Sequence, residues 1–408
     1  MKQHFLIITL LCTIFTLSAK ADKMPLPVKT YSSFIKVLGG GKYDIGVSIV
    51  KAHDNGYVIA GRSVGTSGNM DMSLWKVDEN GNVKWNYKFG DSETEEVYDI
   101  IQTKDGGYIT VGSSDSYGLS VDLKDTWVVK ISAQGKLIWR QTYGDENSIE
   151  EGTCISETED GGFIIGGKII SLTQEDPSGD AFVLKIDNKG IQEWRKTYGG
   201  AKNDEAVGIL PVDGGYTVIG NTESSGKGKW DVWMFNIDLK GTTKWERTYG
   251  GGDTEKANEF VQTEDGGFVF VGYSYTFAEA SLDCWVVKTD KDGQQMWHKS
   301  FGGLSYDEGN GITATKDGGF AITGYTEVWV PDEYGDNTSL EGFNTLLIKI
   351  DSKGQKQWEK SIGGVKEQRG NSLVEAKNGD FIIVGSKQTS DQNNFGVLLI
   401  RTNSNGSI

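Results

Sequence analysis

Short runs of alternating apolar and polar residues recur along the chain, separated by turns rich in Gly and Asp. Residues 98–103 (YDIIQT), 126–131 (TWVVKI) and 137–143 (LIWRQTY) follow this pattern. A period of two predicts β-strands. With a further strand predicted over residues 108–112, these runs make a unit of four antiparallel strands. The period and the high Gly content exclude a helical repeat, so the chain is predicted to be all-β.

An Asp-Gly-Gly-aromatic sequence marks the turn between the first two strands of each unit. Because Asp-Gly tolerates positive φ, we expect a type I′ turn at Asp105-Gly106. Further copies begin at Asp160, Asp213, Asp265 and Asp317, and degenerate copies lie at residues 53–57 and 378–381. The chain therefore holds seven units.

A second signature, Gly-x-x-x-Trp, lies at the entry to the fourth strand of six units. Its tryptophans are Trp85, Trp139, Trp194, Trp245, Trp297 and Trp358. They are separated by roughly 50–60 residues, the size of a four-stranded propeller blade. Seven such units predict a single seven-bladed β-propeller over residues 22–408.

The seventh unit lacks its fourth strand at the C-terminal end. Its third strand is predicted over residues 398–403, and only residues 404–408 follow. Near the N-terminus, residues 33–40 (SFIKVLGG) match the missing strand, with Phe34 at the tryptophan position. We expect this segment to complete the last blade, which would leave the ring without a free sheet edge.

The repeat resembles that of exported bacterial propellers whose units end in Trp-x-x-x-aromatic-Gly-Gly and carry an Asp-Gly-Gly hairpin. This resemblance covers Ser33 to about Asn403. Gly-x-x-x-Trp is also similar to part of the tryptophan-docking motif of quinoprotein-like propellers, in which the Trp packs between neighbouring blades. The fuller motif has Thr before the Gly, whereas here Asp stands three residues before it, as at Asp187. No quinone-binding residues accompany the repeat, so the resemblance implies fold and export only.

The N-terminus has the pattern of an export signal. Lys2 precedes an apolar run over residues 5–17, and Ser18-Ala19-Lys20-Ala21 follows. We expect residues 1–21 to be a signal peptide that is cleaved after Ala21. The mature chain, residues 22–408, is then expected to be secreted or periplasmic. It has no other long apolar run, so no membrane insertion is expected.

Charge narrows the classes of partner. The signal peptide holds two lysines and no acid, so its removal changes the net charge from −16 to −18. A surface this acidic disfavours nucleic acid and anionic membranes. Cys154 and Cys284 fall at different repeat positions, which disfavours a disulfide. We expect a monomer that stands without such cross-links.

In a propeller, the loops that join strand four to strand one and strand two to strand three share one face, here called the top face. Acidic residues recur there just before the first strand of each unit. They are Asp44, Glu95, Glu150, Asp204, Glu255 and Asp307, with Gln368 in the seventh. This ring predicts either an architectural role, with backbone N–H groups as partners, or a Ca²⁺ site at the channel mouth. No other cofactor is expected.

Aromatic residues outside the repeat positions are the candidates for ligand binding. They fall in the loops of the top face and are Tyr117, Trp230, Tyr275, Phe277, Trp329 and Tyr334. Two of them belong to the longest insertion, which is predicted as a loop over residues 326–344. Exposed rings of this kind bind sugars or peptide side chains, or else pack loops onto the blades.

Catalytic signatures are weak in this chain. The mature chain has only His53, in a turn of the opposite face, and His298, in a fourth strand. Ser-His-Asp and histidine metal centres are therefore disfavoured. We expect a non-catalytic binding or scaffold propeller that presents a glycan or protein ligand site.

Two other hypotheses stay open at this stage. One is a glycoside hydrolase that uses two top-face carboxylates, with Asp332, Glu333 and Asp336 as candidates. The other is a structural component of a cell-envelope complex.

Overall fold

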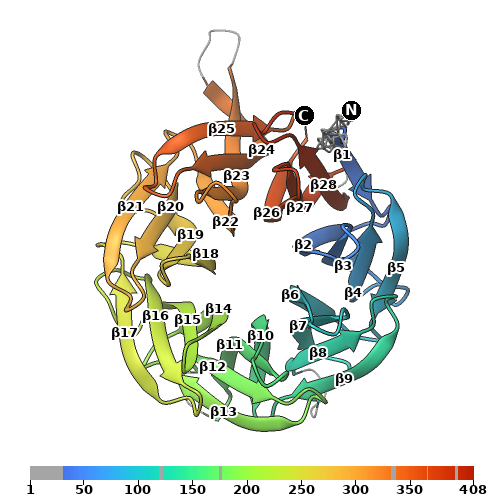
Figure 1. The fold of residues 1–408 in the computed structure, drawn as a ribbon, viewed down its shortest axis with the longest axis vertical. Coiled ribbons are helices and arrows are strands. Elements are labelled where there is room, and N and C mark those ends of the chain that lie inside the picture. Colours follow the sequence, from blue (N-terminus) through green and yellow to red (C-terminus); the bar gives the residue numbers. More distant parts are fainter. Residues whose placement is uncertain (1–30, 119–122, 174–176, 332–336, 365, 391–393) are drawn as a thin grey trace, which may run out of the picture. The chain divides into compact units, whose positions relative to one another are not determined.

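The computed structural model describes residues 31–118, 123–173, 177–331, 337–364, 366–390 and 394–408. The predicted signal peptide, residues 1–21 with cleavage after Ala21, lies outside these ranges. Residues 32–408 belong to one unit, and within the described ranges they form seven four-stranded sheets (Figure 1). None of the described segments is a helix that could cross a membrane.

Each sheet is one blade, and in blades 1 to 6 the strands pair antiparallel in chain order from the channel outward (Figure 1). Blade 1 holds β2 (Asp44–Lys51), β3 (Tyr57–Val64), β4 (Met70–Val77) and β5 (Val83–Phe89). Blade 2 holds β6 (Glu95–Gln102), β7 (Tyr108–Ser114), β8 (Asp125–Ile131) and β9 (Leu137–Tyr143). Blade 3 holds β10 (Ser148–Glu157), β11 (Phe163–Ser171), β12 (Gly179–Ile186) and β13 (Gln192–Tyr198). Blade 4 holds β14 (Asp204–Val212), β15 (Gly215–Thr222), β16 (Asp231–Asp238) and β17 (Thr243–Tyr249).

The remaining blades follow the same plan. Blade 5 holds β18 (Glu255–Gln262), β19 (Phe268–Ser274), β20 (Asp283–Thr289) and β21 (Gln295–Phe301). Blade 6 holds β22 (Asp307–Ala314), β23 (Phe320–Pro331), β24 (Asn337–Ile350) and β25 (Lys356–Ile362). Blade 7 holds β26 (Gln368–Glu375), β27 (Phe381–Gln388), β28 (Phe395–Thr402) and, from the other end of the chain, β1 (Phe34–Leu38). The predicted seven-bladed all-β propeller is confirmed.

Strand β1 closes the ring as predicted. It pairs antiparallel with β28, with Phe34 opposite Arg401 and Leu38 opposite Val397. Seven clusters of buried apolar side chains lie between neighbouring blades, one at each junction, including the junction of blades 7 and 1. The core is therefore a set of inter-blade layers around the channel.

The Asp-Gly-Gly hairpins differ from the predicted type I′ turn. Gly106 N donates to Thr103 O at 2.8 Å, and Gly106 has φ +84°. Asp105 is not among the described residues with positive φ, whereas a type I′ turn needs two in succession. The hairpin is a type I turn followed by a left-handed glycine. Asp105 Oδ1 accepts the Gly107 N–H at 3.0 Å, which explains the Asp.

A buried basic residue on the third strand pairs with the hairpin Asp in six blades. The pairs are Lys76–Asp54, Lys130–Asp105, Lys185–Asp160, Lys288–Asp265, Lys349–Asp317 and Arg401–Asp380. Hydrogen bonds from Lys288 and Thr263 lower the pKa of Asp265 to about 2. The hairpins are thus tied to the sheet interior.

The repeated tryptophans pack between blades, as the resemblance implied. A methyl group built on Gly241 would lie 3.0 Å from the Trp194 ring, which belongs to the preceding blade. The same contact recurs at every junction. In the last blade Phe34 replaces the tryptophan and lies against Gly81, and Trp358 lies against Gly406.

Candidate functional site

The wall of the channel is built from the first strands of the seven blades, and each carries a β-bulge. The bulged residues, which have no partner in the register with the second strand, are Val47, Tyr98, Thr153, Val207, Asn258, Asn310 and Asn371. A bulge turns an extra side chain away from the regular alternation. Here it gives the channel a ring of side chains that alternation alone does not predict.

A glycine on each second strand faces this bulge. These residues are Gly61, Gly112, Gly167, Gly220, Gly272, Gly324 and Gly385. A methyl group at any of them would lie between 1.7 and 2.2 Å from a backbone carbonyl oxygen of the first strand. Only glycine leaves room for the bulged backbone at this position.

Four bulged side chains connect one blade to the next. Asn258, Asn310 and Asn371 donate from Nδ2 to the carbonyl oxygens of Gly309, Gly370 and Gly46 at 2.7–2.9 Å. Thr153 donates to Ala206 O at 2.6 Å. The inner ring is therefore held by hydrogen bonds across blades as well as by the apolar layers.

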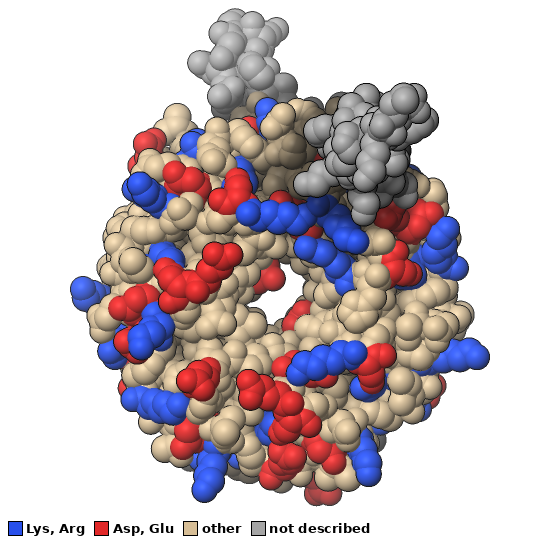
Figure 2. Space-filling model, viewed as in Figure 1, with Lys and Arg blue, Asp and Glu red and all other residues tan. Residues whose placement is uncertain are grey.

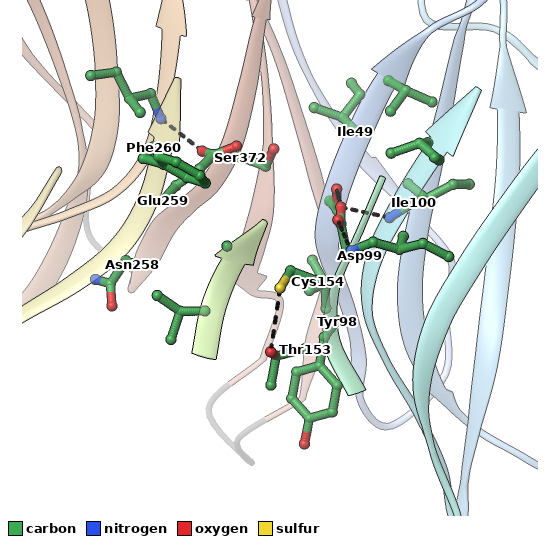
Figure 3. A pocket seen from close by; sticks show the side chains of 18 of the residues that line it. Ile49, Tyr98, Asp99, Ile100, Thr153, Cys154, Asn258, Glu259, Phe260 and Ser372 are labelled. Atoms are coloured by element: carbon green, nitrogen blue, oxygen red, sulfur yellow. Dashed lines mark hydrogen bonds between the residues drawn. The ribbon is translucent and has the colours of Figure 1, made fainter. Parts of the chain in front are cut away.

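The channel holds a pocket of about 380 Å³ (Figure 3). Two of the side chains that line it are carboxylates, Asp99 on β6 and Glu259 on β18, and none of the lining residues is Lys, Arg or His. They follow the bulge directly, in blades 2 and 5. The equivalent residues of the other blades are small or neutral: Ser48, Cys154, Gly208, Gly311 and Ser372.

Within the described part of the chain, the donors to the two carboxylates are uncharged. Asp99 accepts from Ser48 Oγ at 3.2 Å, from Ile100 N at 2.7 Å and from Ile155 N at 3.2 Å. Glu259 accepts from Ile312 N at 2.8 Å. Burial raises the pKa of Asp99 to about 6 and that of Glu259 to about 8. The pocket is thus a half-enclosed acidic site without a counter-charge.

On each first strand, the residue that follows the acidic-ring position is partly exposed at the channel mouth on the top face. These residues are Ile45, Glu96, Glu151, Glu205, Lys256, Glu308 and Arg369. Lys256 Nζ lies 3.0 Å from Glu205 and 3.6 Å from the centre of the Trp230 ring. Arg369 lies over the Tyr325 ring at 4.7 Å. Figure 2 shows acidic and basic side chains mixed over one face of the ring, with the channel open at its centre.

Exposed aromatic rings gather on the top face of blades 5 and 6. Tyr275, Tyr306 and Trp329 are 42%, 41% and 39% exposed. Glu327 Oε2 accepts from Tyr306 N and from Trp329 Nε1, both at 3.2 Å. The Tyr275 ring meets that of Tyr273 edge-on at 6.3 Å. We call Tyr273, Tyr275, Tyr306 and Trp329 the blade 5–6 aromatic surface.

The other predicted aromatics lie elsewhere. Tyr117 and Phe277 hold equivalent positions, three residues after the last residue of the second strand, so they do belong to a repeat position. Each stacks on a tryptophan of the third strand, Trp127 or Trp285, at 5.5 Å. Their ligand role stays a prediction, as it does for Trp230 beneath Lys256.

The insertion of blade 6 is an extended β-hairpin and not the predicted loop. Strands β23 and β24 stay paired as far as Pro331 opposite Asn337, because the alternating segment TEVWV continues the ladder. The hairpin projects beyond the rest of the ring (Figure 1). Tyr334 and the candidate acids Asp332, Glu333 and Asp336 lie outside the described residues.

The predicted acidic ring is buried. Asp44, Glu95, Glu150, Asp204, Glu255 and Asp307 are at most 6% exposed. Most accept backbone N–H groups of the preceding loop, as Asp204 does from Gly200 at 2.8 Å and Glu255 from Gly251 at 2.6 Å. The described residues contain no group of three or more His, Cys, Asp or Glu side chains that could hold a metal ion. A Ca²⁺ role for this ring stays a prediction.

Most members of the ring meet a second carboxylate from the preceding blade. A methyl group on Gly199 would lie 2.4 Å from Asp180 Oδ1 and 2.6 Å from Asp204 Oδ2, so the two acids share the space beside this glycine. The same holds for Asp71 with Glu95, Asp231 with Glu255 and Asp283 with Asp307. At the junction of blades 6 and 7, both positions hold amides, Asn344 and Gln368.

We expect Asp180→Asn to stabilise the protein at neutral pH. Burial and the Asp204 carboxylate raise the pKa of Asp180. An acid with a raised pKa stabilises the fold fully at acidic pH, and this contribution is lost as the pH rises through its folded pKa. The amide of the variant carries no charge at neutral pH, so this loss of stability does not occur, and it can donate a hydrogen bond to Asp204. We expect the free energy of unfolding to rise by about 1 kcal/mol.

Urea unfolding at pH 7 and pH 3.5 measures the effect. The gain should be present at pH 7 and shrink at pH 3.5, where Asp180 is protonated in the folded state. Asp187→Asn is the control with the opposite sign, since backbone hydrogen bonds lower the pKa of Asp187. A gain of equal size at both pH values would contradict the charge argument.

Comparison with known proteins supports the fold but assigns no family. No family model matches the chain. A curated relative, regulatory protein FlaEY of Caulobacter vibrioides, is 25% identical over 232 residues, which are 52% of this chain and 24% of the relative. The chain therefore spans about a quarter of that protein, and its resemblance to a specific exported family stays a prediction.

Solved structures of low identity share the propeller architecture. The WD40 domain of Pan2 from Neurospora crassa superposes with a TM-score of 0.52 at 12% identity, over 90% of this chain and 99% of that domain. Puromycin hydrolase superposes with a TM-score of 0.54 at 11% identity, over 88% of this chain and 52% of the hydrolase. At these identities the likeness concerns the fold alone.

Proposed function

We propose that this protein is an exported, non-catalytic binding propeller whose blade 5–6 aromatic surface takes a glycan. The observation that carries the proposal is the grouping of Tyr275, Tyr306 and Trp329, three exposed rings from separate segments of the top face. Large aromatic rings are more often buried, and exposed groups of them mark interaction sites.

The polar surroundings of these rings suit a sugar ligand. Glu327 accepts hydrogen bonds from the Tyr306 backbone N–H and from the Trp329 ring N–H, which ties the segment that carries Tyr306 to the Trp329 ring before a ligand arrives. Glu308 accepts a hydrogen bond from the Tyr325 hydroxyl nearby. Rings with a flat apolar face, set among hydrogen-bonding groups, match the alternation of C–H faces and hydroxyl edges on a pyranose.

A rigid scaffold with variable loops favours binding at this face. The strands of the seven blades repeat closely. The extended hairpin of blade 6 and the loop that carries Tyr275 in blade 5 differ in length or sequence from the corresponding segments of the other blades. Functional residues concentrate in such variable segments on rigid frameworks. A single site is expected, because the aromatic grouping breaks the seven-fold repeat.

A binding screen of the full chain against a panel of polysaccharides tests the proposal. Tryptophan fluorescence reports binding, and the Tyr275→Ala/Trp329→Ala double variant should weaken it by roughly tenfold or more, since buried aromatic anchors dominate binding energy. Tyr87→Ala, which removes an exposed ring of blade 1, is the control and should leave affinity unchanged.

The same screen separates the alternative functions. Release of shortened sugar products would favour the glycoside hydrolase hypothesis over simple binding. Silence across the panel would reject the glycan ligand, and the protein-scaffold hypothesis would then be tested by partner capture from the cell envelope.

A further inference from the structure

The pocket in the channel shares no lining residue with the blade 5–6 aromatic surface. Its two carboxylates break the repeat: the residue that directly follows the bulge of the first strand is small or neutral in five blades and acidic in blades 2 and 5. A framework role would recur in most blades, as the buried acidic ring does in six of seven. The two exceptions therefore require a local cause.

The pocket offers acceptors and lacks cations. Asp99 and Glu259 face it, and neither forms a salt bridge with a described residue. Asn258 and Asn371 donate hydrogen bonds from Nδ2, which leaves Oδ1 of each able to accept. Burying two carboxylates without a counter-charge is unfavourable. A cation that enters the pocket supplies that counter-charge, so its binding is favoured.

The shape favours an organic cation over a metal ion. The carboxylates stand on first strands of blades 2 and 5, on opposite sides of the space (Figure 3). The volume of about 380 Å³ suits a small molecule. Apolar side chains, among them Val50, Ile101 and Leu210, line the same pocket and suit a methylene chain.

We propose that the channel pocket binds an aliphatic diammonium ion, with one ammonium group at Asp99, the other at Glu259 and the methylene chain between them. Each ammonium group supplies the positive charge that its carboxylate lacks and donates charge-assisted hydrogen bonds to it. The site is independent of the glycan proposal, because it uses none of the residues of the aromatic surface.

Binding is expected to strengthen as the pH rises. Alkylammonium groups have a pKa near that of lysine, about 10.4, so they stay charged at pH 8.5. Glu259 and Asp99 ionise between pH 5 and pH 8.5, since burial raises the pKa of each. The other titratable groups in the wall, Tyr98 and Cys154, stay neutral throughout, because burial raises the pKa of both.

Titration calorimetry of the full chain with 1,4-diaminobutane tests the proposal. At pH 8.5 we expect one saturable site, with affinity at least tenfold higher than for butylamine and at least tenfold higher than at pH 5. The Asp99→Asn/Glu259→Gln variant should bind the diamine with an affinity lower by roughly tenfold or more. The control Glu264→Gln changes an exposed acid of a hairpin and should bind as the parent does.

Several outcomes would overturn the proposal. They are no binding at pH 8.5, equal affinity for butylamine and the diamine, and displacement of the diamine by equimolar CaCl₂. Unchanged affinity in the double variant would do the same. If that variant fails to fold, the comparison of mono- and diamine and the pH dependence, both measured on the parent protein, still decide.

Discussion

Gly112→Ala is expected to destabilise the propeller by roughly 3 kcal/mol or more, near the upper end of what overpacking a close-packed interior produces. The added methyl group would lie 1.9 Å from Glu96 O, a backbone atom of the bulged first strand. A flexible side chain could move aside, but this carbonyl is fixed, because Glu96 is paired with Ser113 and Val97 with Gly112 itself. Relief requires opening the bulge itself.

Urea unfolding monitored by circular dichroism measures this change. Gly303→Ala is the matched control. Nothing lies within 4 Å of the methyl group that the alanine would add, and the backbone of Gly303 is not in the left-handed region. It should stay within about 0.5 kcal/mol of the parent. A loss below about 1 kcal/mol for Gly112→Ala would mean that the bulge yields easily and does not shape the channel.

Trp194→Ala is expected to cost roughly 3 kcal/mol, the lower end for large aromatic truncations, because the ring is half-buried. The indole closes the junction of blades 3 and 4, against Gly241 and 6.4 Å from the Tyr216 ring. Removing the indole leaves a gap at the junction of the two sheets.

Thermal and urea unfolding, compared with Ile191→Ala, check this prediction. Ile191 lies in the same hairpin but is 60% exposed, so its loss should be nearly neutral. An effect of Trp194→Ala below about 1 kcal/mol would indicate that the inter-blade contact contributes little to stability.

The blade count, the ring closure and the inter-blade tryptophans were all predictable from the sequence, because each depends on a motif that recurs at a fixed spacing. Phe34 illustrates the strength of this signal. It stands far from the other copies and lacks the tryptophan itself, yet its place in the repeat was enough to predict its partner blade.

The channel pocket was not predictable in the same way. Asp99 lies in a segment that reads as simple alternation, and only the bulge at Tyr98 shows that the register shifts there. The signal was present as an acid at a position that is otherwise small or neutral. Recognising it required knowing that this position faces the axis.

The prediction of a loop for the blade 6 insertion was wrong for a different reason. Its length and its Pro, Gly and Asp content suggested a loop, but cross-strand pairing with residues 337–344 continued the existing ladder. Pairing between distant residues can override local turn propensity. The turn type of the Asp-Gly-Gly hairpins was mistaken because a side-chain acceptor, Asp105, stabilises an alternative that the dipeptide alone does not specify.

Strand β1 joins residues near both ends of the chain, and this bears on how the protein is made. Six blades are each contiguous in sequence and can form from local pairing, whereas blade 7 needs β1 and β28 to meet. Until then β1 has no partner strand, and the six completed blades form an open arc whose first and last blades each expose an inter-blade face. Contacts of such large sequence separation form late and slowly. The rate-limiting event in folding is therefore expected to be this final closure, and the chain should remain sensitive to protease until it occurs.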